Sequence, residues 1–153
     1  MKRYISDDEK YYTYMLKVIN SIGGRNLNYN WLITDIEAYP EDPELYQFIS
    51  SSNYLFLSND ELMDMLEKDD FQWIWAVFSA IPKEYSKEEV LKYKLPYADC
   101  NSDLFKEDLF VIQHPLSDIE IVAADGSFVS IVAKEDKIVD RFKNVYKNSK
   151  INF

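Results

Sequence analysis

The residues best suited to nucleophilic or metal chemistry are few in this chain. Cys100 is the only cysteine and His114 the only histidine, so a cysteine–histidine nucleophile pair must use these two residues. No neighbouring residue orients the histidine, and Pro115 follows it directly. We therefore interpret His114 as a loop residue. One histidine and one cysteine also cannot build a multi-histidine metal centre or a four-cysteine zinc site.

Oxygen-bearing side chains from Asp99 to Asp103 resemble the start of a calcium loop. The pattern then breaks, because Leu104 stands where such a loop needs glycine and Phe110 where it needs a bidentate glutamate. A turn or helix-capping role for Asp103 fits the sequence better. We therefore predict no metal site.

Two pairs of carboxylates are spaced so that they share a strand face, Asp35 with Glu37 and Asp118 with Glu120. A general acid and base need two such groups in different surroundings. With 27 acidic residues in the chain, however, pairs at this spacing are expected on solvated strand edges. The three glycines do not form a dinucleotide fingerprint or a phosphate loop. We predict no catalytic residues and no cofactor, and we expect no enzyme activity.

The most informative feature is an uneven distribution of charge. The formal net charge is −10, and the segment 26–82 carries all of it, because its acidic residues outnumber its single base, Lys68, by ten. The rest of the chain is neutral. Such a surface repels nucleic acid and anionic membranes and attracts a basic partner. The alternative is that the acidic residues only keep an aromatic-rich protein soluble.

The same segment is rich in aromatic residues, and aromatic anchors within a charged rim are typical of protein-binding surfaces. Of its tryptophans, Trp31, Trp73 and Trp75, we expect at least two in the core. The residues predicted to bind a partner, chosen by the charge of this segment, are Asp35, Glu37, Glu41, Asp42, Glu44, Tyr46, Asp64, Glu67, Asp69 and Asp70.

The helices and strands that position these residues can be predicted from the sequence. Together they indicate a single α+β domain over residues 1–153. The apolar run 73–78 predicts a central strand covered on both faces, with strands at 31–37, 54–57 and 119–133 beside it. Within the last stretch, Asp125-Gly126 suits a type I′ hairpin that sets Ala123 opposite Phe128 and Ile121 opposite Ser130. Because a hairpin breaks strict βαβ alternation, we expect a mixed, mostly antiparallel sheet with a C-terminal β-hairpin and flanking helices.

Helices are predicted between these strands. Capping boxes, in which a serine precedes a glutamate by three residues, begin at Ser6, Ser58 and Ser86. The first predicts a helix over 7–22, and Pro43 fits the start of a short helix over 44–49. The last helix, over 135–147, has as its predicted inner face Ile138, Val139, Phe142, Val145 and Tyr146. Residues 94–114 are expected to form a long loop.

Length and composition indicate where such a domain functions. At 153 residues the chain is long enough to bury about 68–70% of its unfolded surface. A single cysteine allows no internal disulfide, which favours a reducing compartment. Acidic residues near the first methionine interrupt the apolar region of a signal peptide, and no run approaches about 18 apolar residues. We expect a soluble, cytoplasmic protein.

Three parts of the sequence carry a family resemblance. They are 30–33 (Asn-Trp-Leu-Ile), 75–82 (Trp-Ala-Val-Phe-Ser-Ala-Ile-Pro), and 115–122 (Pro-Leu-Ser-Asp-Ile-Glu-Ile-Val) continuing through 125–127 and 134–136 into the last helix. Together they resemble small acidic immunity proteins of bacterial polymorphic-toxin and contact-dependent growth inhibition systems. The resemblance implies a cytoplasmic protein that binds one cognate toxin domain, often a nuclease, and blocks its active site or substrate groove. It implies no contact residues, so those named above rest on charge.

Two other functions remain open. One is a small enzyme, with Asp99, Asp103 and His114 as the residues around its site, which a deep pocket with a perturbed carboxyl group would favour. The other is a structural subunit or adaptor that self-associates through exposed aromatic residues. For the immunity function we expect a monomer or weak dimer and a basic toxin domain as the partner.

Overall fold

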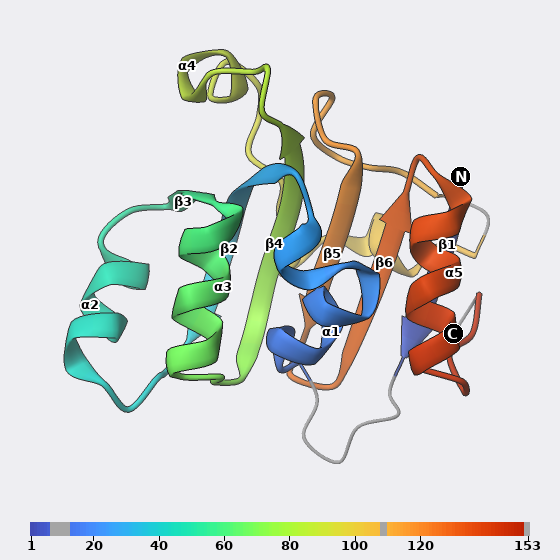
Figure 1. Cartoon of the computed structure of the whole chain (residues 1–153), viewed down its shortest axis with the longest axis horizontal. Coiled ribbons are helices and arrows are strands. Elements are labelled where there is room, and N and C mark those ends of the chain that lie inside the picture. The colour runs from blue at the N-terminus through green and yellow to red at the C-terminus, as the bar shows by residue number, and fades with distance from the viewer. Residues whose placement is uncertain (7–12, 108–109, 152–153) are drawn as a thin grey trace.

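The computed structural model describes residues 1–6, 13–107 and 110–151 as a six-stranded sheet with five α-helices (Figure 1). The strands are β1 (Lys2–Ser6), β2 (Tyr29–Ala38), β3 (Tyr54–Ser58), β4 (Trp73–Pro82), β5 (Ile119–Ala124) and β6 (Phe128–Ala133). The helices are α1 (Met15–Ile22), α2 (Pro43–Ser50), α3 (Asn59–Lys68), α4 (Lys87–Val90) and α5 (Asp136–Val145), with 3₁₀ turns η1 (Gly24–Asn26) and η2 (Ser102–Phe105). The sheet order is β1-β6-β5-β4-β2-β3, and every pair is antiparallel. The predicted α+β class is confirmed.

Strand β4 is the central element, as its apolar sequence predicts. It pairs with β5 on one side and β2 on the other, and residues 76–81 are buried on both faces of the sheet. Aromatic and β-branched side chains suit such a doubly covered strand. Trp31 and Trp73 are fully buried and Trp75 is half-buried, which confirms that at least two of the three tryptophans belong to the core.

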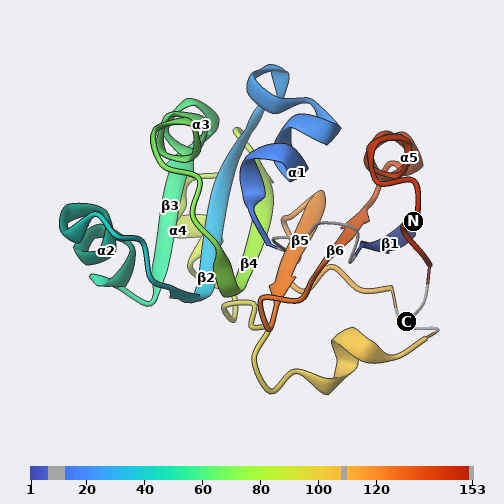
Figure 2. The ribbon, with the colours of Figure 1, turned by 90° about the horizontal axis from the view of Figure 1, so that it is seen from below.

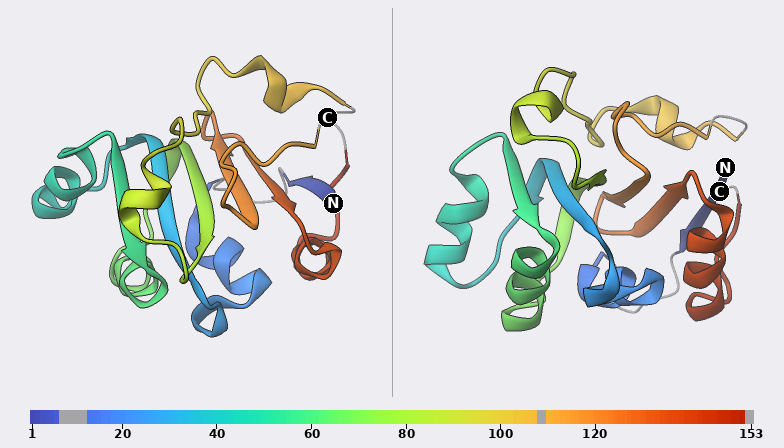
Figure 3. Two further views of the ribbon diagram at one scale, coloured as in Figure 1. Left: turned by 90° about the horizontal axis from the view of Figure 1, so that it is seen from above. Right: turned by 45° about the horizontal axis from the view of Figure 1, so that its top comes forward.

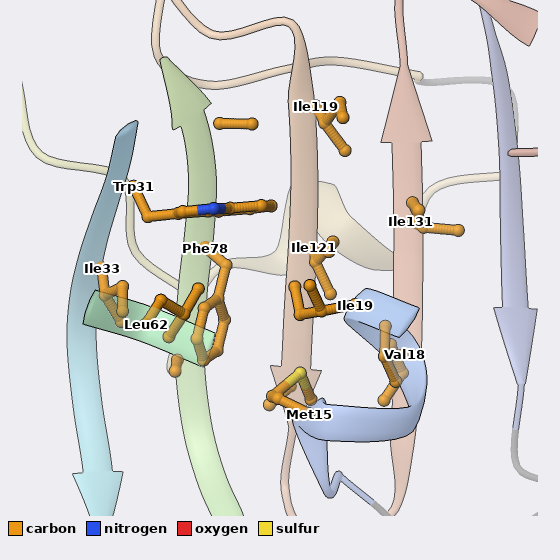
Figure 4. Packing of buried hydrophobic residues seen from close by; sticks show 14 of the residues in the cluster. Met15, Val18, Ile19, Trp31, Ile33, Leu62, Phe78, Ile119, Ile121 and Ile131 are labelled. Carbon is orange, nitrogen blue, oxygen red and sulfur yellow. The ribbon is translucent and has the colours of Figure 1, made fainter. Parts of the chain in front are cut away.

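The main core lies between the sheet and three helices, α1, α3 and α5, which cover one face (Figure 2). Trp31 and Phe78 from neighbouring strands belong to the same buried cluster as Met15 of α1 and Leu62 of α3 (Figure 4). Burying each such side chain contributes roughly 1.5–3 kcal/mol. The indole nitrogen of Trp31 is also satisfied, because it donates to Oδ1 of Asn59 at 2.9 Å.

The opposite face of the sheet is covered by a long connection with little regular structure. Residues 83–107 and 110–118, which we call the strap, contain only α4 and η2 and cross the sheet on the side away from α1, α3 and α5 (Figure 3). Beneath the strap, Val77 and Val122 pack with Ala98. The predicted long loop is therefore a covering layer.

The predicted helix starts at Ser58 and Ser86 are confirmed. Both serines accept a hydrogen bond from the backbone of the glutamate three residues on, and both glutamates reach back, so α3 and α4 begin with complete capping boxes. Pro43 occupies the first turn of α2, and Asp42 caps that helix through Glu44 N. Helix α5 forms as predicted, but Val145, expected on its inner face, is 46% exposed.

The C-terminal hairpin turns at the predicted dipeptide. Asp125 and Gly126 both have positive φ, 52° and 60°, as a type I′ turn requires, and Ser127 N donates to Ala124 O at 2.9 Å. Strand pairing resumes only at Phe128, which lies opposite Ala124. Ser127 is therefore an extra residue on one side of the hairpin.

This extra residue changes the register. The predicted pairs, Ala123 with Phe128 and Ile121 with Ser130, are wrong, because Ile121 lies opposite Ile131. Residues directly opposite each other share a face, so the observed register joins two apolar residues in the main core, whereas the predicted one would not.

The N-terminal region differs most from expectation. No strand was predicted for Lys2–Ser6, yet these residues form the edge strand β1, paired with β6. The predicted start of the first helix falls on residues 7–12, which lie outside the described residues, and α1 itself begins at Met15. Within the described ranges, no helix has the length and apolar character needed to span a membrane.

Candidate functional site

Several of the predicted partner-binding residues meet at the lower end of the sheet in Figure 1. There, β2 leads into α2 and α3 leads into β4. Ala38 at the end of β2 pairs with Trp73 at the start of β4, and Tyr14 forms a bridge with Gln72, so three segments come together. Between them lies a cavity of about 450 Å³, the acidic hollow, whose lining includes Tyr14, Tyr39, Glu41, Asp69, Asp70 and Gln72.

The acidic hollow carries uncompensated negative charge. Among the residues that the structure describes, no lysine or arginine lies within ion-pairing distance of Glu41, Asp69 or Asp70. Burial raises the pKa of Asp70, the backbone N–H of Leu16 opposes that rise, and neighbouring Asp69 adds to it. The Leu16 N–H donates to Asp70 at 3.4 Å in the first turn of α1, where negative charge is stabilising. Asp70 thus also supports the helix.

Aromatic residues extend the hollow towards α2. Tyr39 is 64% exposed and its ring stacks on that of Tyr46, with centroids 6.2 Å apart. Glu44 and Phe48 of the same helix are also exposed. Exposed rings beside carboxylates can take up the apolar stem and the charged end of a lysine or arginine side chain.

Six of the ten predicted residues lie in or beside the hollow, and four lie elsewhere. Glu41, Asp69 and Asp70 line the hollow, and Asp42, Glu44 and Tyr46 lie beside it on α2 or at its cap. Asp64 and Glu67, on the outer face of α3, each accept a hydrogen bond from Arg25 at 2.6 Å. Glu37 is half-buried in the irregular part of β2 and does not line the hollow.

Asp35 belongs to a different part of the molecule. It has a positive φ of 51° at a β-bulge of β2, and its carboxylate accepts hydrogen bonds from Ala98 N at 2.7 Å and Asp99 N at 2.8 Å. Aspartate tolerates this conformation better than most residues. Asp35 therefore fastens the strap to the sheet.

The residues of the enzyme alternative do not converge on one site. His114 is buried, its Nδ1 accepts from Leu116 N, and its Nε2 bonds the carbonyl of Val90, while burial lowers its pKa. Cys100 is exposed and its thiol donates to neighbouring Asp99. Within the described ranges, no group of three or more potential ligand residues is placed to hold a metal ion.

The second predicted carboxylate pair is also separated. Asp118 bonds Lys134 at 3.1 Å and Tyr29 at 3.5 Å, beside α5. Glu120 is buried under the strap, where burial raises its pKa to about 7. The two carboxyl groups line different cavities, so they cannot act on one substrate.

Sequence reasoning found the acids of the hollow but not all of its aromatic wall. Tyr14 was missed as a lining residue because it is far from both Glu41 and Asp70 in the sequence. The available signal was the position of strand ends, since the end of β2 and the start of β4 must meet when these strands pair. Comparisons with protein-family models, curated protein sequences and solved structures found no match.

Proposed function

We propose that this chain is an immunity-type binding module, which neutralises a basic toxin domain in the cytoplasm by binding it at the acidic hollow and α2. The observation that carries the proposal is the convergence of Glu41, Asp69 and Asp70 with exposed Tyr39 in one cavity. None of these carboxylates has a cationic partner among the described residues. The family resemblance of the sequence supports the same function.

The physical basis is charge complementarity. A surface of one sign speeds the association of an oppositely charged partner, and aromatic anchors within it supply short-range affinity. A nuclease must bind phosphates and therefore presents basic residues around its active site. A cluster of carboxylates can occupy those basic residues in place of the substrate, which would block the enzyme.

The two alternatives each have one supporting observation. Exposed Tyr39, Tyr46 and Phe48 would suit an adaptor that self-associates, whereas the immunity function needs only a monomer or weak dimer. The raised pKa of buried Glu120 would suit an enzyme. Of the three residues named for that alternative, Asp103 lines the cavity that contains Glu120, whereas Asp99 and His114 do not. The binding function accounts for both the carboxylates that lack an ion pair within the described residues and the exposed aromatic residues at this surface, whereas each alternative accounts for one observation.

A charge-reversal experiment tests the proposal. The test variant is Glu41→Lys with Glu44→Lys, and the control is Glu84→Lys with Glu88→Lys. In each variant one residue lies in a loop and the other in the first turn of a helix, all four side chains are exposed, and the net charge changes from −10 to −6. Each chain is co-expressed with a candidate toxin, the basic C-terminal domain of a large secreted protein sought beside its gene, and growth and affinity are measured.

The native chain and the control should restore growth and bind the toxin domain equally well. The test variant should bind at least about tenfold more weakly, with most of the loss in the association rate at low salt. Equal protection by both variants would remove the acidic hollow from the interface. Failure of the native chain to bind that domain at any salt concentration would refute the immunity function for that toxin.

A further inference from the structure

A second cavity lies on the other side of the molecule, between the sheet and the strap. It has a volume of about 280 Å³, and its lining includes Arg3 of β1, Glu120 of β5, Ser130 of β6, and Tyr97, Asn101 and Gln113 of the strap. By the volume of water in the liquid, it has room for roughly nine water molecules or a ligand of about ten non-hydrogen atoms. We call it the strap cavity.

Glu120 is the unusual residue of this cavity. It is 1% exposed, and its carboxylate accepts a hydrogen bond of 2.8 Å from Gln113 N. No lysine or arginine in the described part of the chain forms an ion pair with it. A buried carboxylate without a cation is costly and is usually paired. The strap cavity therefore contains a buried acid that forms no ion pair with the cationic residues described, including Arg3 and Lys94 in the cavity lining.

Hydrogen bonds from Gln113 offset only part of this cost, because the pKa of Glu120 is still raised to about 7. Its register neighbour on β4 is Ser79, which is fully buried and whose Oγ has no hydrogen-bond partner among the described residues. Arg3 lines the same cavity, but its guanidinium donates to the carbonyls of Leu104 and Lys106 at 3.3 and 3.1 Å. It fastens the strap and forms no ion pair with Glu120.

The walls of the strap cavity are held in place by specific hydrogen bonds. Thr34 Oγ1 donates to Pro96 O at 2.7 Å, and Tyr97 N and O bond the side chain of Gln113 at 3.0 and 3.1 Å. With the bonds from Ala98 and Asp99 to Asp35, these contacts fix the strap above the sheet. A long irregular segment held open over a cavity is a common arrangement for ligand binding, because a pre-formed site loses little entropy when it binds.

We propose that the strap cavity binds a small organic monocation, an amine, amidine or guanidine of about ten non-hydrogen atoms, whose charged nitrogen pairs with Glu120. Leu95, Leu104 and Val111 provide apolar wall for the body of such a ligand. Lys94 and Asp103 also line the cavity. Asp103 is paired with Lys106, so Lys94 and Arg3 disfavour a second positive charge on the ligand. This site is independent of the proposed toxin-binding function.

The test compares four probes by isothermal titration calorimetry and amide chemical shifts. Butylguanidine and benzylamine are monocations, butylurea is the neutral counterpart of butylguanidine, and agmatine is a dication of similar length. The variants are Glu120→Gln, which keeps the shape and the acceptor for Gln113 N, and Asp69→Asn, which removes a charge from the acidic hollow instead.

A monocation should bind the native chain and Asp69→Asn equally and Glu120→Gln at least about tenfold more weakly. Shifts should centre on residues 94–97 and 111–113. Affinity for the native chain should rise about tenfold from pH 6 to pH 8, because Glu120 must ionise, and this rise should be absent in Glu120→Gln.

Three results would overturn the proposal. One is that neither monocation binds at about 10 mM, a concentration that detects even weak sites. Another is that butylurea binds as well as butylguanidine. The third is that agmatine binds best and its binding is lost in Asp69→Asn, since this would indicate unspecific attraction to the acidic surface.

Discussion

The two cavities hold carboxylates under opposite conditions. The acidic hollow has Glu41, Asp69 and Asp70 at the molecular surface, where water and salt screen them. The strap cavity has one acid, Glu120, removed from water. Burial raises the pKa of Glu120 to about 7, and in the hollow it also raises the pKa of half-buried Asp70. The burial of an acidic residue, more than the number of acidic residues around it, therefore determines how much free energy of folding it costs.

The comparison also separates charge from function. The acidic residues of the segment 26–82 dominate the net charge. Most of them are exposed, so each has little effect on the free energy of unfolding. Glu120 lies in the electrically neutral part of the sequence and has the largest expected effect on stability. Asp35 belongs to the acidic segment 26–82 in the sequence. In the structure, however, it supports the strap cavity, because its carboxylate holds the strap.

The largest predicted effect concerns Glu120 and pH. Its pKa is about 7 in the folded state and near 4.5 when unfolded, so between these values the folded state binds more protons. The free energy of unfolding therefore falls as pH rises, by about 3 kcal/mol in total. Glu120→Gln should be more stable than the native chain by about 3 kcal/mol at pH 8 and by less than about 1 kcal/mol at pH 5.

Urea unfolding at the two pH values measures this difference. Glu88→Gln, an exposed acid on α4, is the control and should follow the native chain at both. If Glu120→Gln had the same stability advantage at pH 5 and pH 8, the ionisation of Glu120 would not be its cause.

The next effect concerns Asp35. Asp35→Ala removes the acceptor for Ala98 N and Asp99 N and should lower the free energy of unfolding by about 2 kcal/mol. Amide hydrogen exchange at both positions should become faster. Asp35→Asn keeps an acceptor and tolerates the positive φ, so it should lose less stability. An unchanged exchange rate in Asp35→Ala would show that other contacts hold the strap.

Much of the fold follows from local patterns in the sequence. The apolar run of β4 predicts the central strand, and the serine–glutamate pairs at the starts of α3 and α4 predict those helices, because each pattern acts within a few residues. Strand β1 escaped prediction because it is short and pairs with β6, more than a hundred residues away. The hairpin register failed because one extra residue after a correctly predicted turn moves the whole pairing.

The candidate sites show the same limit. Charge along the sequence identified Glu41, Asp69 and Asp70, since loops at the same end of a sheet bring such residues together. Charge could not show that Asp35 lies apart from these residues, because its hydrogen-bond partners are more than sixty residues away in the sequence. Glu120 was noticed only as half of a carboxylate pair, because burial under the strap depends on contacts that no local pattern encodes.

A smaller effect separates binding from stability in the acidic hollow. Glu41→Lys with Glu44→Lys, and likewise Glu84→Lys with Glu88→Lys, should change the free energy of unfolding by no more than about 0.5 kcal/mol. All four side chains are exposed and form no ion pair within the described residues. Thermal and urea unfolding of the two variants measure this. A loss of stability in the first variant alone would mean that its weaker toxin binding reflects the fold rather than the interface.

The smallest effect concerns Arg25, which bonds Asp64 and Glu67 on the outer face of α3. Arg25→Ala should release both carboxylates and, through the stronger negative field, roughly double the association rate with a basic toxin domain at low salt. The difference should vanish at about 0.5 M salt, where screening acts within a few ångströms. Lys83→Ala makes the same change in net charge at an exposed residue that forms no ion pair within the described residues. Equal acceleration by both variants would assign the effect to total charge, whereas slower association in Arg25→Ala would place Arg25 itself in the interface.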